Sequence, residues 1–405
     1  MSSVETDLRR ILWIQALRAF AYGFGIVVLG TTLAGSGLSD AAVTLVFTAM
    51  LAGMAVASIV VGRIGERVGR RRSYAILLAM MGATGVVFAL SESLWVLCVV
   101  ALTGTMSTDA NESGPITSIE QAMIGQAPAE ARVHVFGRYN AVAYLAGAVG
   151  ALAAGGPAFL RSAWQGAPSS QRWLLVFPLV AAVSVALAMQ LGPRVEAGRE
   201  APERPLTRSR GNVLRLSALF ATDSFAGGFV VASFMAFWFS RRFDASLELM
   251  SAVFFAAGLL QAASSIVAAR VGARVGLLNT MVWTHLPSNL LLMAVPLMPS
   301  VGPAVVCLLA RFALSQMDVP TRQAYIAALV DPEERTAAAA FTNTSRYVAR
   351  PFGQILAGPL MANVALGAPF VVAGTIKCGY DLVLWRMFRR VELPESAATR
   401  PRPSA

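Results

Sequence analysis

The residues of this sequence that could do chemistry are charged side chains inside strongly apolar segments. Arg18 and Asp223 stand 205 residues apart, at matching places in two similar stretches, Arg18–Phe24 and Asp223–Phe229. Glu120 and Arg322 are the first residues of a second pair of similar stretches, and they stand 202 residues apart. A charge deep in a hydrophobic helix costs at least about 2.5–3.5 kcal/mol on insertion scales, so such residues usually mark a polar cavity, an ion pair or a transport path. We therefore expect these residues in the working part of the molecule.

Two polar runs interrupt apolar segments at corresponding places in the two copies. Ser107–Pro115 ends in Gly-Pro, and Ser315–Arg322 contains Pro320. Paired, proline-interrupted helices at equivalent positions point to a transporter's binding site, and the alternative is a kink without function. We expect substrate near these runs, whose neighbourhood also carries the charged side chains Asp109, Glu112, Arg311 and Asp318.

Composition places the elements that must position these residues in a bilayer. The chain is 56% hydrophobic and 14% charged, with a mean hydropathy of +0.62, which is far too apolar for a soluble protein of 405 residues. Apolar runs of about 18–25 residues, long enough to cross a hydrocarbon core, recur along it. The expected fold class is an all-α membrane protein with twelve spans in two parallel six-helix repeats. The expected spans lie near 11–35, 41–61, 74–91, 95–123, 136–160, 173–191, 214–240, 246–269, 279–298, 303–328, 337–361 and 368–387.

The distribution of arginine predicts the orientation and the domains. Arginines crowd the second and sixth connections, and short basic loops face the cytoplasm, so both termini are expected there. The net charge of +11 then reflects topology and contact with anionic lipid, and no nucleic-acid partner is expected. We expect an N-terminal bundle at 1–191, a cytoplasmic linker at 192–213, a C-terminal bundle at 214–388 and a cytoplasmic tail at 389–405. The first apolar run is too long for a removable signal peptide, and an arginine-rich chain with one lysine hints at a bacterial inner membrane.

One loop motif is specific enough to suggest a family. Gly62–Arg71 reads GRIGERVGRR, and it resembles the G-x-x-x-[DE]-R-x-G-R-[RK] signature of the major facilitator superfamily of secondary transporters. Glycines allow close helix approach, and the acid can cap a helix or pair with arginine, so the motif is expected to latch one conformation. The alternative is that its arginines only anchor the loop to lipid. The expected gating residues are Gly62, Glu66, Arg67, Gly69, Arg70 and Arg71.

The resemblance covers the whole chain and implies a central cavity lined by the first, fourth, seventh and tenth spans. There, Arg18 would face Asp223 and Glu120 would face Arg322 across the two halves, or the paired residues would share a substrate. Protonation of Asp223 or Glu120 would free an arginine and switch the contact, because a buried pair is seldom retained for stability alone. The alternatives are static pairs, or headgroup contacts for Glu120 and Arg322. His285 could titrate near neutral pH and relay protons. Its span is peripheral in this family, however, so we expect a structural role for it.

Some features depart from the family pattern. Ala101 stands where proton-coupled members carry an arginine in the fourth span, and Ala273 replaces the acid of the motif in the second half. The glycines near Gly147 and Pro157 are a degenerate version of an antiporter signature and favour export modestly.

The function expected from the sequence is secondary transport by alternating access, with proton-coupled efflux of small organic or amphiphilic compounds as the leading form. No enzymatic motif or cofactor site stands out, and the expected partners are a small-molecule substrate, lipid and protons, for a monomer. The alternatives are import of an anionic solute by Arg18, Arg311 and Arg322, export of a metalloid through Cys98 and Cys307, and a membrane sensor or assembly factor without transport.

Overall fold

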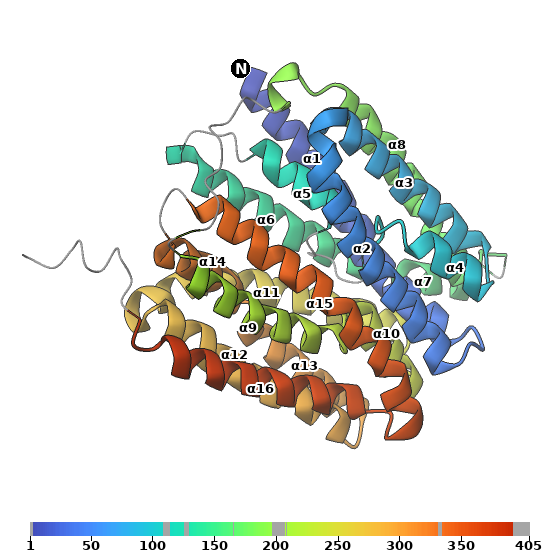
Figure 1. Ribbon diagram of the computed structural model, residues 1–405. Coiled ribbons are helices and arrows are strands. Elements are labelled where there is room, and N and C mark those ends of the chain that lie inside the picture. Colours follow the sequence, from blue (N-terminus) through green and yellow to red (C-terminus); the bar gives the residue numbers. More distant parts are fainter. Residues whose placement is uncertain are drawn as a thin grey trace, which may run out of the picture.

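The computed structural model describes residues 3–107, 114–124, 129–164, 166–196, 207, 209–330 and 334–391. Every regular element in these ranges is a helix (Figure 1). The first half holds α1 (Ser3–Ala34), α2 (Asp40–Val68), α3 (Arg70–Leu90), α4 (Leu94–Ala101), α5 (Pro115–Ile124), α6 (Ala129–Ala153), α7 (Gly156–Ala163), η1 (Ser170–Leu175), α8 (Val176–Met189) and η2 (Pro193–Val195). The second holds α9 (Arg210–Gly228), α10 (Ala232–Phe243), α11 (Leu247–Val275), α12 (Leu277–Ala294), η3 (Val295–Leu297), α13 (Val301–Ser315), α14 (Asp318–Leu329), α15 (Arg335–Asn363) and α16 (Ala368–Phe388).

Local sequence signals set the same helix boundaries in both halves. Ser39 caps the start of α2 by accepting a hydrogen bond from the Ala42 amide, and Ser246 caps α11 in the same way. The two helices are 29 residues long, and each ends at a glycine with positive φ, Gly69 at 94° and Gly276 at 86°. Only glycine adopts this conformation without strain, so the chain can turn straight into the next helix. The internal repeat is therefore visible in the caps.

Eight helical stretches of the described chain are long and apolar enough to cross a bilayer, judged by length and composition. The other four expected spans are still helical, and charge, interruption or, in α12, polar side chains such as Asn279, His285 and Asn289 lower their hydropathy. The span expected near 95–123 is divided into α4 and α5, with 108–113 outside the described residues. α15 carries Arg346 and Arg350, and α16 carries Lys377 and Asp381.

Backbone contacts at glycine hold equivalent helices together in each half. A β-carbon on Gly150 of α6 would lie 2.0 Å from the carbonyl oxygen of Phe20 in α1. A β-carbon on Gly353 of α15 would lie 1.9 Å from the carbonyl oxygen of Phe225 in α9. Phe20 and Phe225 are 205 residues apart, the spacing of Arg18 and Asp223. The two halves therefore repeat a packing geometry that only glycine permits.

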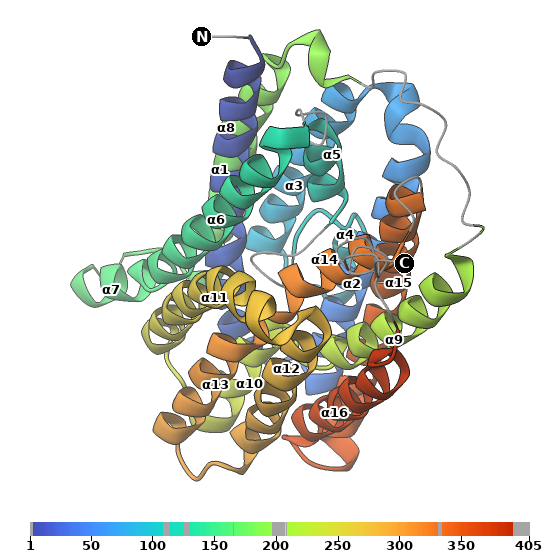
Figure 2. The ribbon, with the colours of Figure 1, turned by 90° about the vertical axis from the view of Figure 1, so that its left-hand side faces the viewer.

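The two bundles meet along α2 with α15, α6 with α11, and α1 with α10 (Figure 2). Several contacts between the bundles lie at the helix ends remote from the termini, which we call the closed end. Gly30 lies against Ser233 there, and Gly155 lies against Ser251. The guanidinium of Arg241 also contacts the Asp40 carboxylate at 3.4 Å.

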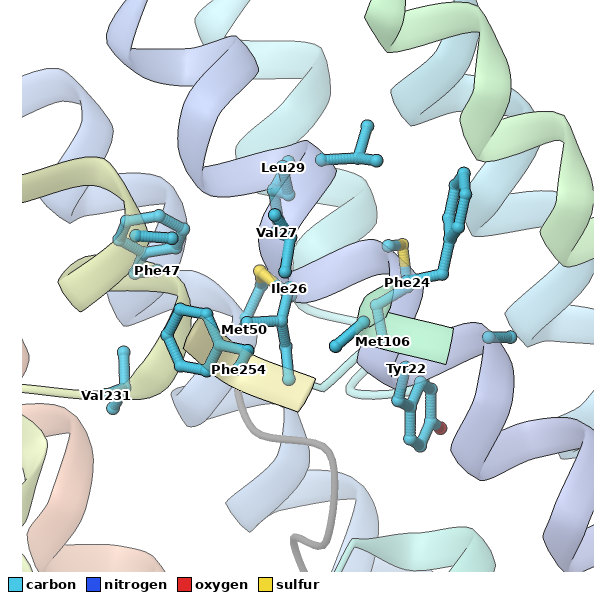
Figure 3. Close-up of a cluster of buried hydrophobic side chains, with 14 of the residues drawn as sticks. Tyr22, Phe24, Ile26, Val27, Leu29, Phe47, Met50, Met106, Val231 and Phe254 are labelled. Carbon is cyan, nitrogen blue, oxygen red and sulfur yellow. The ribbon is translucent and has the colours of Figure 1, made fainter. Parts of the chain in front are cut away.

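A buried apolar cluster continues across this junction. It includes Ile26 of α1, Met50 of α2 and Phe254 of α11 (Figure 3). Side chains from both halves thus share one core near the closed end, where the bundles are held together.

Much of the expected linker, 197–206, and the expected tail from 392 lie outside the described residues. α9 begins at Arg210, within the range expected for the linker, and α16 ends at Phe388.

Replacing Gly150 or Gly353 by alanine should destabilise the protein by about 1–3 kcal/mol, because the added carbon meets a backbone oxygen that cannot rotate away. Gly379→Ala is the matched control, since a β-carbon there has no neighbour within 4 Å and a mid-helix alanine is favourable. Thermal unfolding of the purified protein in detergent measures both. Equal melting temperatures for Gly150→Ala and Gly379→Ala would contradict the packing argument.

Candidate functional site

The first buried charge cluster is centred on Glu120 in α5. Its Oε2 accepts hydrogen bonds from Arg18 of α1 at 2.6 Å and from the Tyr139 hydroxyl of α6 at 2.5 Å. Its Oε1 accepts one from the Tyr74 hydroxyl of α3 at 2.6 Å. Glu120 is 0% exposed and Arg18 is 3% exposed, and Arg18 also donates to Gln15. Four helices of the first half therefore enclose the Glu120 carboxylate, and both of its oxygens accept hydrogen bonds.

The second half pairs its charges differently. Lys377 of α16 donates to Asp223 of α9 at 2.5 Å. Arg322 donates to Asp318 at 2.6 Å, one turn earlier on α14. All four side chains are buried.

These contacts correct the pairing expected from the sequence. Arg18 does not meet Asp223, and Glu120 does not meet Arg322, because each residue pairs within its own bundle. The physical reason lies in the packing: the glycine contacts hold α1 on α6 and α9 on α15, so the charged faces of α1 and α9 turn toward their own neighbours. The two reversals of sign between the repeats give each half one acid and one base at these positions, and only in the first half do the two pair with each other.

A cavity of about 340 Å³ lies between the halves. The first half lines it with uncharged residues, including Gly23, Gln121 and Tyr144. All the charged groups among its described lining residues come from the second half, and five are cationic, two anionic and one a histidine. They are Arg311, Arg322, Arg346, Arg350, Lys377, Asp223, Asp318 and His285.

The cavity lies on the terminus side of the closed end. Along α1 it is lined by Gly23 and Ile26, before the contact at Gly30, and along α11 it is lined from Phe254, after the contact at Ser251. The Tyr144 hydroxyl donates to Gln316 at 3.3 Å and joins the two halves at the cavity wall. The bundles are thus closed beyond the cavity at the end remote from the termini.

The two interrupted segments have different surroundings. The break between α13 and α14 lines the cavity through Ser315, Gln316 and Asp318. The described parts of the other run, Ser107 and Gly114–Pro115, line a pocket of only about 10 Å³ beside Arg18. Asp109 and Glu112 lie outside the described residues.

Sequence reasoning missed a polar group shared by α12 and α16. Asp381 Oδ1 lies 2.9 Å from His285 Nδ1, and its Oδ2 accepts from Asn289 at 2.9 Å. His285 lines the cavity, although we expected it in a peripheral structural position. Lys377 and Asp381, four residues apart in an apolar helix, were a signal of the kind used for Arg18.

The loop motif joins α2 to α3 through Gly69 alone. Gly62 and Glu66 lie within α2, and their side chains are outside the described part. Arg67 is exposed, Arg70 donates to the Ala122 carbonyl and Arg71 donates to the Leu191 carbonyl. The carboxylate that accepts from the Arg70 amide, at 2.6 Å, belongs to Glu196 at the start of the linker segment. Sequence reasoning expected an acid of the motif itself in this capping position.

In the described ranges, no group of three or more His, Cys, Asp and Glu is placed to hold a metal ion. Cys98 lies on α4, which packs on α2 and α3, whereas Cys307 lies on α13, which packs on α11 and α12. The two thiols therefore have different neighbours, and the convergence that a metalloid site requires is not seen in this part of the chain.

Glu120→Gln should destabilise the protein by about 3–5 kcal/mol, because it leaves the Arg18 guanidinium buried without its counter-charge. The matched control is Glu5→Gln, which removes an Arg9–Glu5 pair of the same 2.6 Å length that is about half exposed, and it should cost below about 1 kcal/mol. Thermal unfolding in detergent provides the measurement. The double variant Arg18→Met, Glu120→Leu should recover part of the loss, because it removes the unpaired charge but leaves the Tyr74 and Tyr139 hydroxyls without this acceptor. A Glu120→Gln protein as stable as Glu5→Gln would refute the prediction.

Comparisons with known proteins give one consistent result. The Major Facilitator Superfamily matches residues 11–354. An uncharacterized membrane protein of Saccharomyces cerevisiae is 26% identical over an alignment 422 residues long. The alignment covers 95% of this chain and 94% of that protein.

Solved structures show the fold. A D-xylose-proton symporter aligns with a TM-score of 0.71 at 14% identity, over 93% of this chain and 97% of that one. An inward-facing, occupied bacterial homolog of the human lysosomal transporter Spinster gives 0.70 at 16% identity, over 98% of each chain. A human organic anion transporter gives 0.65 at 14% identity, over 95% of this chain and 100% of that one.

The predicted arrangement of twelve helices in two six-helix repeats is confirmed by the family match and the shared fold. The repeated caps, the repeated glycine contacts and the cavity between two bundles agree with it. The chain belongs to the Major Facilitator Superfamily and is an integral membrane transporter.

Proposed function

We propose that this protein carries a small organic anion across the membrane by alternating access, with protons as the coupling ion. The observation that carries the proposal is the surplus of positive charge in the cavity. Its described lining has five cationic side chains against two aspartates, and both aspartates are already paired, with Lys377 and Arg322. Cations lining a water-poor cleft concentrate anions and bind them through charge-assisted hydrogen bonds.

The remaining lining supports a substrate with an apolar part. Ile26, Met235, Phe254 and Phe312 line the same cavity. A volume of about 340 Å³ falls at the lower end of the range of about 300–1,000 Å³ that is usual for small-molecule sites. A compact carboxylate or similar anion fits this combination, in line with the import alternative drawn from the sequence and with the name of one structural neighbour.

The proposed cycle uses the two ends of the molecule. In the state described, the bundles are closed beyond the cavity at Gly30, Gly155 and the Arg241–Asp40 contact. If both termini are cytoplasmic, as the arginine distribution predicts, this state faces the cytoplasm. Opening the closed end and bringing the terminus ends together would expose the same cavity to the other side.

Export and the bacterial inner membrane stay predictions from the sequence. Gly150, one of the glycines that favoured export, is needed for the packing of α6 on α1, so packing alone accounts for it. The proteoliposome assay described below reads the direction of transport. It also tests the alternative that the protein is a membrane sensor without transport.

Arg346→Gln should reduce anion transport by about 10- to 100-fold, since a hydrogen bond to a charged group is worth about 1.5–3 kcal/mol in a desolvated site. Arg346 lines the cavity, and its Nε has no hydrogen-bond partner among the described residues. Arg386→Gln, on the exposed side of α16, is the matched control. The measurement uses proteoliposomes with an imposed pH gradient, an internal pH dye and labelled benzoate, succinate or citrate, with choline as a cationic comparison.

Transport of a carboxylate that Arg346→Gln impairs and Arg386→Gln leaves intact would support the proposal. Equal loss in both variants, or transport of choline in preference to the carboxylates, would reject the anion site. Silence toward all compounds would favour the non-transporting alternative.

A further inference from the structure

The polar group shared by α12 and α16 has a built geometry that the anion site does not require. His285, Asn289 and Asp381 are 6%, 0% and 1% exposed, in helices that should lie within the membrane. Asp381 contacts His285 Nδ1 and Asn289 Nδ2, each at 2.9 Å, through its two separate oxygens. Buried polar groups are costly unless they are fully partnered, so such a group is retained where it has a task.

The hydrogen-bond pattern indicates which nitrogen of the His285 ring carries the hydrogen. Nδ1 has two polar neighbours, Asp381 Oδ1 at 2.9 Å and the Asn289 amide nitrogen at 3.2 Å. An ionised carboxylate can only accept hydrogen bonds, so Nδ1 carries the hydrogen in its shorter contact, the one with Asp381. The Nε2 of the neutral ring then keeps its lone pair. Because His285 lines the cavity, a proton from the cavity can bind at Nε2, and the adjacent carboxylate stabilises the resulting imidazolium.

We propose that His285, held by Asp381, is the proton-binding group of this transporter, and that it loads its proton together with the organic anion. This proposal rests on the proposed function. The link to the anion runs through Lys377, which lies one turn before Asp381 on α16 and bonds Asp223 in the cavity. A proton on His285 adds positive charge beside the cations that bind the anion, so each ligand favours the other.

Other charged and titratable groups face His285 from the helices around it, and their effects partly oppose one another. Asp223 on α9 and Asp318 on α14 favour an imidazolium, whereas Lys377 on α16, Arg322 on α14, Arg311 on α13 and Arg346 on α15 oppose it. The Tyr380 ring lies 6.2 Å away, edge to face, and the residues by which α11 lines the cavity are not titratable. Burial of the ring also opposes an imidazolium, and Asp381 is the acid in direct contact that offsets it.

The sign of this coupling differs from the antiport expected from the sequence. A proton that promotes anion binding must travel in the same direction as the anion, which is symport. If Asp223 or Glu120 were the proton site, protonation would instead break an ion pair. The identity of the proton-binding residue therefore decides whether loading a proton leaves the buried ion pairs of the fold intact.

The first test observes the histidine directly. The sequence contains two histidines, so a His134→Gln protein labelled with ¹⁵N-histidine reports His285 alone by NMR. We expect the Nδ1–H form near pH 8 and the doubly protonated ring near pH 5, the range in which imidazoles usually titrate. Benzoate, succinate or citrate, whichever the liposomes transport, should raise the doubly protonated fraction at a fixed intermediate pH. A ring whose protonation is constant over this range, or an anion that lowers the doubly protonated fraction, would overturn the proposal.

The second test separates proton coupling from transport. His285→Gln and Asp381→Asn should lose at least tenfold of the anion accumulation driven by a pH gradient. The exchange of labelled for unlabelled anion that remains at equal pH should no longer change with that pH. Thr284→Ala is the control on the same helix. Its hydroxyl donates to the Thr280 carbonyl, and Thr284 is not among the described residues that line the cavity. Variants that keep pH-driven accumulation would reject the inference and leave the proposed function standing. A wild type that carries no anion would reject the proposed function and the joint loading, and the NMR titration would still judge His285 as a proton-binding group.

Discussion

The need to neutralise charge inside a bilayer organises this molecule. In the first half, Glu120 receives hydrogen bonds from Arg18, Tyr74 and Tyr139, so four helices are tied to one carboxylate. A charge left without a partner at this depth costs several kcal/mol, and a partner from the other bundle would be lost whenever the halves moved apart. Pairing inside each bundle removes this difficulty. Each half can then move as a body without exposing a bare charge to lipid.

The two halves solve the same problem with different results. In the second half the positions of Arg18 and Glu120 hold Asp223 and Arg322, which would complement each other in the same way. Instead, Lys377 takes Asp223 and Asp318 takes Arg322. The offset between the repeats that matches Glu120 with Arg322 also matches Ile116 of the first half with Asp318 of the second. The second half thus has two additional charges, and its charged residues line a cavity to which the first half contributes only uncharged residues among those described.

The sequence predicted the elements better than their contacts. Span positions, the repeat and the importance of charged residues in apolar segments follow from local patterns of hydropathy, and these patterns survive folding. The partner of Arg18 depends on how α1 is rotated in its bundle, which is set by the approach of Gly150 to Phe20, a contact between distant segments. The capping role of Glu196 depends equally on where the chain returns after α8. Lys377 and Asp381 carried the same signal as Arg18, but they have no counterpart in the matched stretches and so drew less attention.

Lys377 is the sole lysine of the chain, and it is 6% exposed at the cavity wall. The only other primary amine of this sequence is the amino group at its N-terminus. The chain therefore carries a natural single-site chemical handle at the point where substrate is expected. A reagent that acylates amines must enter the cavity to reach this side chain, and it must compete with Asp223 for the nitrogen. Reagents confined to one face of a membrane would modify Lys377 only while that face is open, so the rate of acylation would record how the molecule divides its time between its two orientations.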